Sequence, residues 1–157
     1  DGRHVQAAIE CMLHSNALAA RLAVEFGASA CTDVTGFGLL GHLLEMLNKQ
    51  RGATLKLSSI PKLAGALDCI QQGVRSTMHA SNAAALAALG DGVNNTDSHA
   101  IALLLDPQTS GGLLIGVTPA QAEPFCAALR DSGYLHSAVI GEVTELRDGS
   151  RNPLLLT

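Results

Sequence analysis

The residues best suited to binding chemistry lie in one stretch, Thr32–His42, with the sequence TDVTGFGLLGH. A carboxylate, Asp33, ends a short β-prone run, and the six positions 36–41 that follow soon after contain three glycines. Such glycines allow a tight turn and a close approach of the backbone to a ligand. The helix that they open offers free N–H groups and a positive dipole end to an anion. Because carboxylate oxygens bind hard cations such as Mg²⁺, the stretch predicts a site for a metal–phosphate substrate.

A purely structural interpretation of the same stretch is equally open. Thr35 is a favourable N-cap for the following helix, and Asp33 can interact with the helix dipole without binding any ligand. The glycines can be present only because the helix packs closely against a neighbour. Short glycine motifs do not decide between the two interpretations.

Gly36, Gly38 and Gly41 also match the dinucleotide-binding pattern G-x-G-x-x-G. That fold has an acidic residue about 20 residues further on, at the end of the next strand, which binds the ribose. The next expected strand, 54–58, ends in serines. Asp33 would also lie just ahead of the loop that holds the pyrophosphate. A dinucleotide site is therefore disfavoured.

A second polar loop, Asp106–Gly112 (DPQTSGG), lies between two apolar runs. Backbone N–H groups and the hydroxyls of Thr109 and Ser110 in such a loop can contact phosphate. The same residue types are common in a plain hairpin-like turn, so the sequence leaves both interpretations open.

The composition predicts a single folded domain over residues 1–157. Hydrophobic residues make up 47% of the chain and charged residues 15%, with a mean hydropathy of +0.25. This composition is too apolar for a disordered chain. It also leaves apolar areas on the surface that a missing partner can cover. The net charge of −4, without a Lys/Arg cluster, disfavours nucleic-acid binding. No apolar run approaches the roughly 20 residues of a membrane span.

The ends and the cysteines of the chain give two further expectations. The chain begins at Asp1 rather than at Met, as expected of a piece of a longer protein, and no signal peptide is recognisable. The cysteines are widely spaced and form no C-x-x-C pair, so zinc spacing is absent. Buried free thiols in a reducing cytoplasm are the favoured interpretation. Cys31, two residues before Asp33, is either a reactive thiol or, as we favour, a small buried residue.

The hydrophobic pattern predicts helices that alternate with strands. The expected helices span residues 4–27, 36–49, 59–73, 81–89 and 118–133. The expected strands span residues 28–34, 54–58, 100–105, 113–117, 137–146 and 154–156, with a surface loop at 91–99. This order is typical of an α/β or α+β fold with helices packed on a sheet.

Two of the expected helices carry specific predictions. In the first, Val5, Ile9, Met12 and Leu13 are expected to face a core. The second is apolar enough to be buried on more than one side or to meet a partner. Its thin polar stripe comprises His42, Glu45 and Lys49.

The TDVTGFGLLGH stretch and the DPQTSGG loop, with Leu113 and Leu114 after it, together resemble the selenophosphate synthetase (selenide, water dikinase) family. This family belongs to the superfamily of aminoimidazole ribonucleotide synthetase. The first motif in this long form is specific, whereas looser forms of the second are shared across the superfamily. The resemblance covers essentially the whole chain as the superfamily's C-terminal domain, and GEV at 141–143 also fits. It implies a layered helix–sheet sandwich with a mixed sheet.

The resemblance implies an enzyme that uses ATP, selenide and water to make selenophosphate, AMP and phosphate, with Mg²⁺. It implies that Asp33 is a Mg²⁺ ligand that faces the nucleotide phosphates. Residues near the substrate or its phosphates are carried over from both motifs: Thr32, Thr35, Gly36, Gln108, Thr109, Ser110 and Gly111. A cytoplasmic protein that is a homodimer at full length is also expected.

The catalytic residues of that family are expected outside this chain. The family's N-terminal half carries a glycine-rich segment, the reactive Cys or selenocysteine with its Lys, and most ATP and metal ligands. None of the four cysteines here matches the motif of that nucleophile. One carboxylate cannot hold a Mg²⁺–ATP cluster, because hard cations need several oxygens. We therefore expect the chain to line an active site against an N-terminal domain and to be inactive alone.

Two alternative functions remain open. The first is the C-terminal domain of another superfamily member, acting in purine ribonucleotide synthesis, thiamine phosphate phosphorylation or hydrogenase maturation. The long GFGLLGH form disfavours this alternative. The second is a non-catalytic module that binds a partner or a small ligand, which the apolar second helix and the low charge permit.

Overall fold

Two small sheets form the framework of the protein. The structure is a computed structural model that describes residues 2–90, 97–146 and 152–157. Strand β1 (Ala30–Asp33) pairs antiparallel with β3 (Leu113–Gly116). In the second sheet β2 (Arg51–Leu55) lies between β4 (Gly141–Glu145), which is antiparallel to it, and β5 (Leu154–Leu156), which is parallel. The predicted α+β class with a mixed sheet is confirmed.

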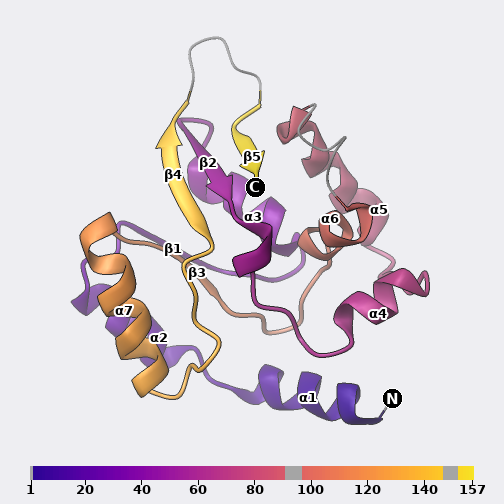
Figure 1. Cartoon of the computed structure of the whole chain (residues 1–157), viewed down its shortest axis with the longest axis horizontal. Coiled ribbons are helices and arrows are strands. Elements are labelled where there is room, and N and C mark those ends of the chain that lie inside the picture. Colours follow the sequence, from indigo (N-terminus) through magenta and orange to yellow (C-terminus); the bar gives the residue numbers. More distant parts are fainter. Residues whose placement is uncertain (1, 91–96, 147–151) are drawn as a thin grey trace.

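Helices cover these sheets on several sides (Figure 1). The α-helices are α1 (Gly2–Leu13), α2 (Ala17–Glu25), α3 (Gly38–Leu47), α4 (Ala66–Gln71), α5 (His79–Asn82), α6 (Ser98–Leu104) and α7 (Pro119–Asp131), and the 3-10 helices are η1 (Leu57–Ser59) and η2 (Ala83–Ala88). None of the helices in the described ranges is long and apolar enough to cross a membrane.

Helix α3 is the centre of the main core. It contacts β1, β2, α6 and η2, and Leu40 on it is completely buried. The cluster around it includes Leu43 and Leu47 of α3, Leu55 of β2 and Leu105 after α6. Burial of α3 on more than one side, as its composition predicts, is thus confirmed. Its polar stripe is not wholly exposed, however, because His42 is only 6% exposed.

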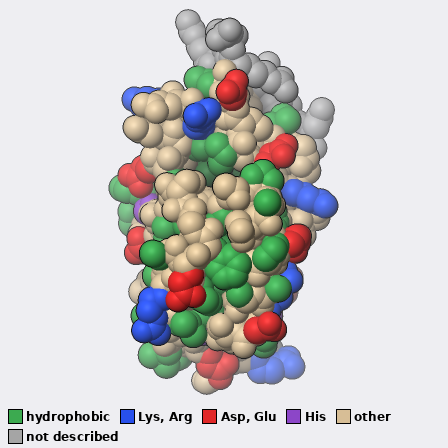
Figure 2. Space-filling view, turned by 90° about the vertical axis from the view of Figure 1, so that its left-hand side faces the viewer, with side chains coloured by type: hydrophobic (Ala, Val, Ile, Leu, Met, Phe, Trp, Pro, Cys, Tyr) green, Lys and Arg blue, Asp and Glu red, His purple; other side chains and the backbone are tan. Residues whose placement is uncertain are grey.

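A second core supports the β1–β3 sheet. Helices α2 and α7 lie side by side, and their buried residues include Ala19, Phe125 and Leu129. The partly buried Leu113 and Ile115 of β3 pack against this cluster. Figure 2 shows this side of the molecule, where apolar side chains lie among interspersed acidic and basic ones. The helix expected at 118–133 is confirmed by α7.

The single helix expected at 4–27 is wrong. The chain breaks between α1 and α2, where the Ser15 hydroxyl accepts from the Ala17 N–H. Helix α1 buries none of its residues. The side chains expected to face a core are exposed instead, by 60% at Val5 and 79% at Leu13, and Ile9 and Met12 are exposed as well.

The strand expected at 100–105 is also wrong, because this apolar run forms α6. A short buried apolar run fits a helix or a strand equally well by periodicity. Asp97 favours the helix over a strand, because its carboxylate caps the helix by accepting from the His99 N–H at 2.9 Å. Of the loop expected at 91–99, residues 91–96 lie outside the described residues, and Ser98 already starts α6.

Several boundaries differ from the sequence predictions. The strand expected at 54–58 lies at 51–55, and η1 follows it at 57–59. Of the helix expected at 59–73, the short α4 at 66–71 is the α-helical part. The helix expected at 81–89 is divided between α5 and η2, and the strand expected at 137–146 is confined to β4. The buried-thiol prediction holds for Cys126 only. All four cysteines are free, and Cys11, Cys31 and Cys69 are exposed.

The topology excludes the dinucleotide-binding fold. That fold requires the strands on either side of the glycine-rich helix to belong to one parallel sheet. Here β1 and β2, which flank α3, belong to different sheets, and β1 pairs antiparallel with β3. The three glycines therefore serve another purpose.

Candidate functional site

The β1–β3 pair brings the two sequence motifs together. Asp33 lies opposite Leu113 in the antiparallel register, and the Val34 N–H donates to the Gly112 carbonyl at 2.9 Å. Beyond the strands, the Gln108 N–H donates to the Thr35 carbonyl at 3.0 Å. Stretches that are far apart in the sequence, 33–36 and 108–112, therefore lie side by side.

Gly111 permits this close approach of the two loops. A Cβ at this position would collide with the carbonyl oxygen of Val34 and with the Gln108 side chain. The Gly111 carbonyl accepts from the Asn16 side-chain amide at 2.9 Å. The break between α1 and α2 therefore places a side chain that fixes the second loop.

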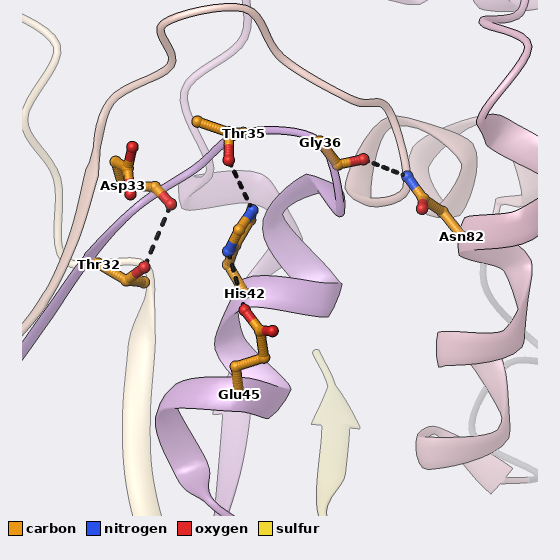
Figure 3. Close-up of polar contacts among 7 residues, drawn as sticks. All are labelled: Thr32, Asp33, Thr35, Gly36, His42, Glu45 and Asn82. Carbon is orange, nitrogen blue, oxygen red and sulfur yellow. Dashed lines mark hydrogen bonds and ion pairs between the residues drawn. The ribbon is translucent and has the colours of Figure 1, made fainter.

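Asp33 presents a free carboxylate at the end of β1. Its side chain is exposed, and within the described ranges no hydrogen bond or ion pair to this carboxylate occurs. The half-buried Thr32 donates its hydroxyl to the Asp33 carbonyl at 3.3 Å, which leaves the carboxylate unused (Figure 3). A carboxylate of this kind is available to a cation from outside.

The donor chemistry at Asp33 fits Mg²⁺, but only as part of a site. Mg²⁺ prefers oxygen ligands and near-octahedral geometry, and it is usually held by one or two carboxylates together with substrate phosphates and waters. Across residues 2–90, 97–146 and 152–157, no three His, Cys, Asp or Glu side chains form a group that could hold a metal. Asp33 can therefore be one ligand of an ion that phosphates and other residues also bind.

Cys31 lies on the same exposed face of β1 as Asp33. Side chains alternate along a strand, and Cys31 and Asp33 are exposed whereas Thr32 between them is half-buried. The favoured prediction of a small buried cysteine is therefore wrong. Partial burial, with a smaller contribution from the Asp33 charge, raises the pKa of the Cys31 thiol. A raised pKa reduces the thiolate fraction, so this thiol is not activated as a nucleophile.

Two of the three glycines are explained by packing. Gly38 has φ +68°, and a Cβ there would lie 2.8 Å from the Leu104 carbonyl oxygen. A Cβ on Gly41 would lie 2.6 Å from Cβ of Phe37. At Gly36, in contrast, a Cβ would meet only the Met78 methyl carbon, at 3.6 Å. Packing therefore requires Gly38 and Gly41 but not Gly36.

Thr35 does not cap α3. The residue at the N-cap position is Phe37, and no side-chain hydrogen bond caps the helix. The Thr35 hydroxyl oxygen instead lies 3.1 Å from Nε2 of the buried His42 (Figure 3). On the other side of the ring, Nδ1 lies 3.2 Å from a Glu45 carboxylate oxygen. The angles of this second contact do not make a hydrogen bond, so Nδ1 has no hydrogen-bond partner within the described part of the chain.

Asn82 joins the first motif to the residue just before the second and was missed by sequence reasoning. Its buried side-chain amide donates to the Gly36 carbonyl at 2.9 Å and to the Leu105 carbonyl at 3.0 Å. Figure 3 shows the first of these bonds. In the sequence, Asn82 before an alanine run suggests only a helix cap, and no local signal indicates partners 46 and 23 residues away.

The second loop combines a half-buried acid with exposed polar groups. Burial raises the pKa of the Asp106 carboxyl, and the nearby His79 and Arg75 oppose this effect. Gln108, Thr109 and Ser110 are exposed, whereas Gly111 is buried. The structure therefore brings the predicted residues of both motifs to one place, with Asp33, Thr109 and Ser110 accessible from outside.

Comparison with known proteins identifies the family of this chain. Residues 4–151 match the family model described as AIR synthase related protein, C-terminal domain. The chain is similar to proteins named selenide, water dikinase: 43% identical over 126 residues in Burkholderia pseudomallei, 41% over 145 in Geobacter metallireducens, and 35% over 150 in Agathobacter rectalis. These matches cover 76%, 87% and 92% of this chain.

The chain spans only 34%, 40% and 42% of the length of these three relatives. The family model nevertheless covers nearly the whole chain. The resemblance drawn from the TDVTGFGLLGH and DPQTSGG motifs is thereby confirmed. The chain belongs to the family of AIR synthase related protein C-terminal domains and, within it, resembles the selenide, water dikinases.

Proposed function

We propose that this chain is the C-terminal domain of a selenide, water dikinase and that it lines one side of the active site. The reaction of the complete gene product would convert ATP, selenide and water to selenophosphate, AMP and phosphate. One observation carries the proposal. The Gln108–Thr35 hydrogen bond joins the two motif loops, one of which carries the exposed Asp33 carboxylate and the other the exposed Thr109 and Ser110.

Each accessible group of this surface has a proposed role. Asp33 would hold Mg²⁺, which when bound supplies neutralisation of the charge on the nucleotide phosphates. Thr109, Ser110 and nearby backbone N–H groups would donate to phosphate oxygens. Thr32 and Gly36 would lie at the edge of the same site.

The chain is proposed to act together with an N-terminal domain of the same protein. A single carboxylate does not complete a Mg²⁺ site, and the relatives are more than twice as long as the segment that this chain matches. The exposed apolar residues of α1 support a covered surface, since large apolar patches mark interaction sites. We further propose that the full-length protein is a cytoplasmic homodimer and that this chain alone is inactive.

The test is an assay of the complete gene product that contains this chain. ATP is supplied with and without selenide, and AMP and selenophosphate are measured. The proposal expects AMP formation that depends on selenide, and no product from the 157-residue chain alone. Phosphorylation of another acceptor, without any response to selenide, would retain the family and contradict the proposed substrate. Selenophosphate made by the isolated chain would contradict its proposed inactivity.

A further inference from the structure

His42 is a buried imidazole between a hydroxyl and a carboxylate. It is 6% exposed, and the Phe37 ring lies against it with a centroid separation of 5.5 Å. Nε2 lies 3.1 Å from the Thr35 hydroxyl oxygen, and Nδ1 lies 3.2 Å from a Glu45 carboxylate oxygen. A polar ring in an apolar helix costs free energy unless its nitrogens have suitable partners.

The two neighbours determine which nitrogen carries the proton. A neutral imidazole has one N–H donor and one acceptor nitrogen. The Glu45 carboxylate would repel a lone pair on Nδ1 and attracts a proton there, even without good hydrogen-bond angles. With the proton on Nδ1, Nε2 can only accept a hydrogen bond. The Thr35 hydroxyl must then be the donor.

The Thr35 backbone is held in place independently of this contact. Its carbonyl accepts from the Gly38 N–H at 3.1 Å and from the Gln108 N–H at 3.0 Å. The backbone position of Thr35 therefore does not depend on His42, whereas the direction of its hydroxyl proton does. Once its proton points to His42, the oxygen has only lone pairs left for any other partner.

We propose that His42 is a positioning residue that makes the Thr35 hydroxyl an acceptor toward the active site. An acceptor oxygen repels a phosphate oxygen but binds a divalent cation or a water on that cation, and Mg²⁺ in proteins usually keeps several waters. Thr35 would thus serve the metal, whereas Thr109 and Ser110 serve the phosphates. The inference rests on the proposed function, because it assigns Thr35 to the Mg²⁺ side of that site.

The first test reads the proton directly, without any assay of activity. The complete gene product is labelled with ¹⁵N in its histidine rings, and long-range ¹H–¹⁵N spectra show which ring nitrogen is protonated. The resonance of His42 is identified by its loss in His42→Gln. The proposal expects the proton on Nδ1, and a shift of the Nε2 resonance in Thr35→Val but not in Thr35→Ser. A proton on Nε2 would overturn it, because Thr35 would then be free to donate to phosphate.

The second test separates metal binding from nucleotide binding. In Thr35→Val and His42→Leu, the Mg²⁺ concentration for half-maximal activity should rise by about 10-fold, within the range for outer partners of metal sites. The KM for ATP at saturating Mg²⁺ should change little. Thr35→Ser retains the hydroxyl, and in His42→Gln an amide oxygen can replace Nε2, so both should retain most of the wild-type Mg²⁺ requirement. Thr144→Val, on the exposed strand β4, is the matched control.

The outcomes distinguish this inference from the proposed function. If Asp33→Asn raises the Mg²⁺ requirement but folded Thr35→Val does not, the role of Thr35 is overturned and the proposed function stands. If His42→Leu fails to fold, Thr35→Val and the ring spectra decide the question. If Asp33→Asn has no effect on the Mg²⁺ requirement, the metal site of the proposed function fails, and the metal role of Thr35 fails with it.

Discussion

The backbone N–H of Gln108 donates to the carbonyl of Thr35 at 3.0 Å, and this bond joins two loops that are separated by more than 70 residues in the sequence. The loop that carries the exposed Asp33 is therefore held against the loop that carries the exposed Thr109 and Ser110. Neither loop alone would form a metal–phosphate site. The relationship depends on the β1–β3 register, which places Asp33 opposite Leu113.

Asn82 should contribute strongly to stability because it supports both loops. In Asn82→Ala, the Gly36 and Leu105 carbonyls would each lose a hydrogen-bond donor. Buried acceptors left unsatisfied cost about 1–3 kcal/mol each. Urea denaturation should therefore show a clear decrease in the free energy of unfolding. Ser81→Ala, at the exposed neighbouring residue, is the control and should change it by less than about 0.5 kcal/mol. Equal effects of the two variants would contradict the role of Asn82.

Gly38→Ala should cost more than the same change at Gly73. Both glycines have positive φ, +68° and +81°. An alanine in this left-handed backbone conformation lowers the free energy of unfolding by roughly 1–2 kcal/mol at either position. Only at Gly38 would the new Cβ lie 2.8 Å from backbone atoms, whereas at Gly73 nothing lies within 4 Å. Overpacking adds about 1–3 kcal/mol. Measured unfolding free energies that are equal for the two variants would show that α3 does not pack tightly on the end of α6.

The first motif shows how much of the fold and of the site the sequence could predict. The motif TDVTGFGLLGH predicts β1, α3 and the turn between them correctly, because a β-prone run, glycines and an apolar helix pattern are local signals. Whether a glycine is needed for a ligand or for packing depends on which atoms lie next to it in the fold. For Gly38 that neighbour is the end of α6, a segment that the sequence pattern predicts as a strand.

Long-range partners explain the other differences. His42 belongs to a polar stripe by its spacing, yet it is buried, with the Phe37 ring and the Thr35 hydroxyl as neighbours. Asn82 resembles a helix cap but binds two distant carbonyls. The break before α2 lets Asn16 reach Gly111. Periodicity carries no information about such contacts, which only the assembled fold determines.

Asp106→Asn should stabilise the protein at neutral pH. Burial raises the pKa of this carboxyl in the folded state, so the folded state binds the proton more tightly than the unfolded chain does. This contribution to stability is complete below the unfolded pKa of about 3.9 and is lost as the pH rises through the folded value. Asparagine has no charge to bury, so the variant should have the higher urea midpoint at pH 7.

The advantage of Asp106→Asn should shrink as the pH falls towards about 4, where the wild-type carboxyl is protonated as well. Asp68→Asn, at an exposed position on α4, is the control and should show no such pH-dependent gain. A variant that is less stable than the wild type at pH 7 would mean that the attraction of His79 and Arg75 outweighs burial.

The most direct test of the central claim is the Mg²⁺ dependence of the complete gene product with Asp33→Asn. ATP- and selenide-dependent AMP formation is measured over a range of Mg²⁺ concentrations, with Asp68→Asn as the matched control and circular dichroism to confirm folding. If Asp33 is a metal ligand, its loss should exceed the about 10–100-fold effect of residues that only support metal ligands. Extra Mg²⁺ should restore part of the activity. Full activity of the folded variant at the wild-type Mg²⁺ requirement would contradict the claim.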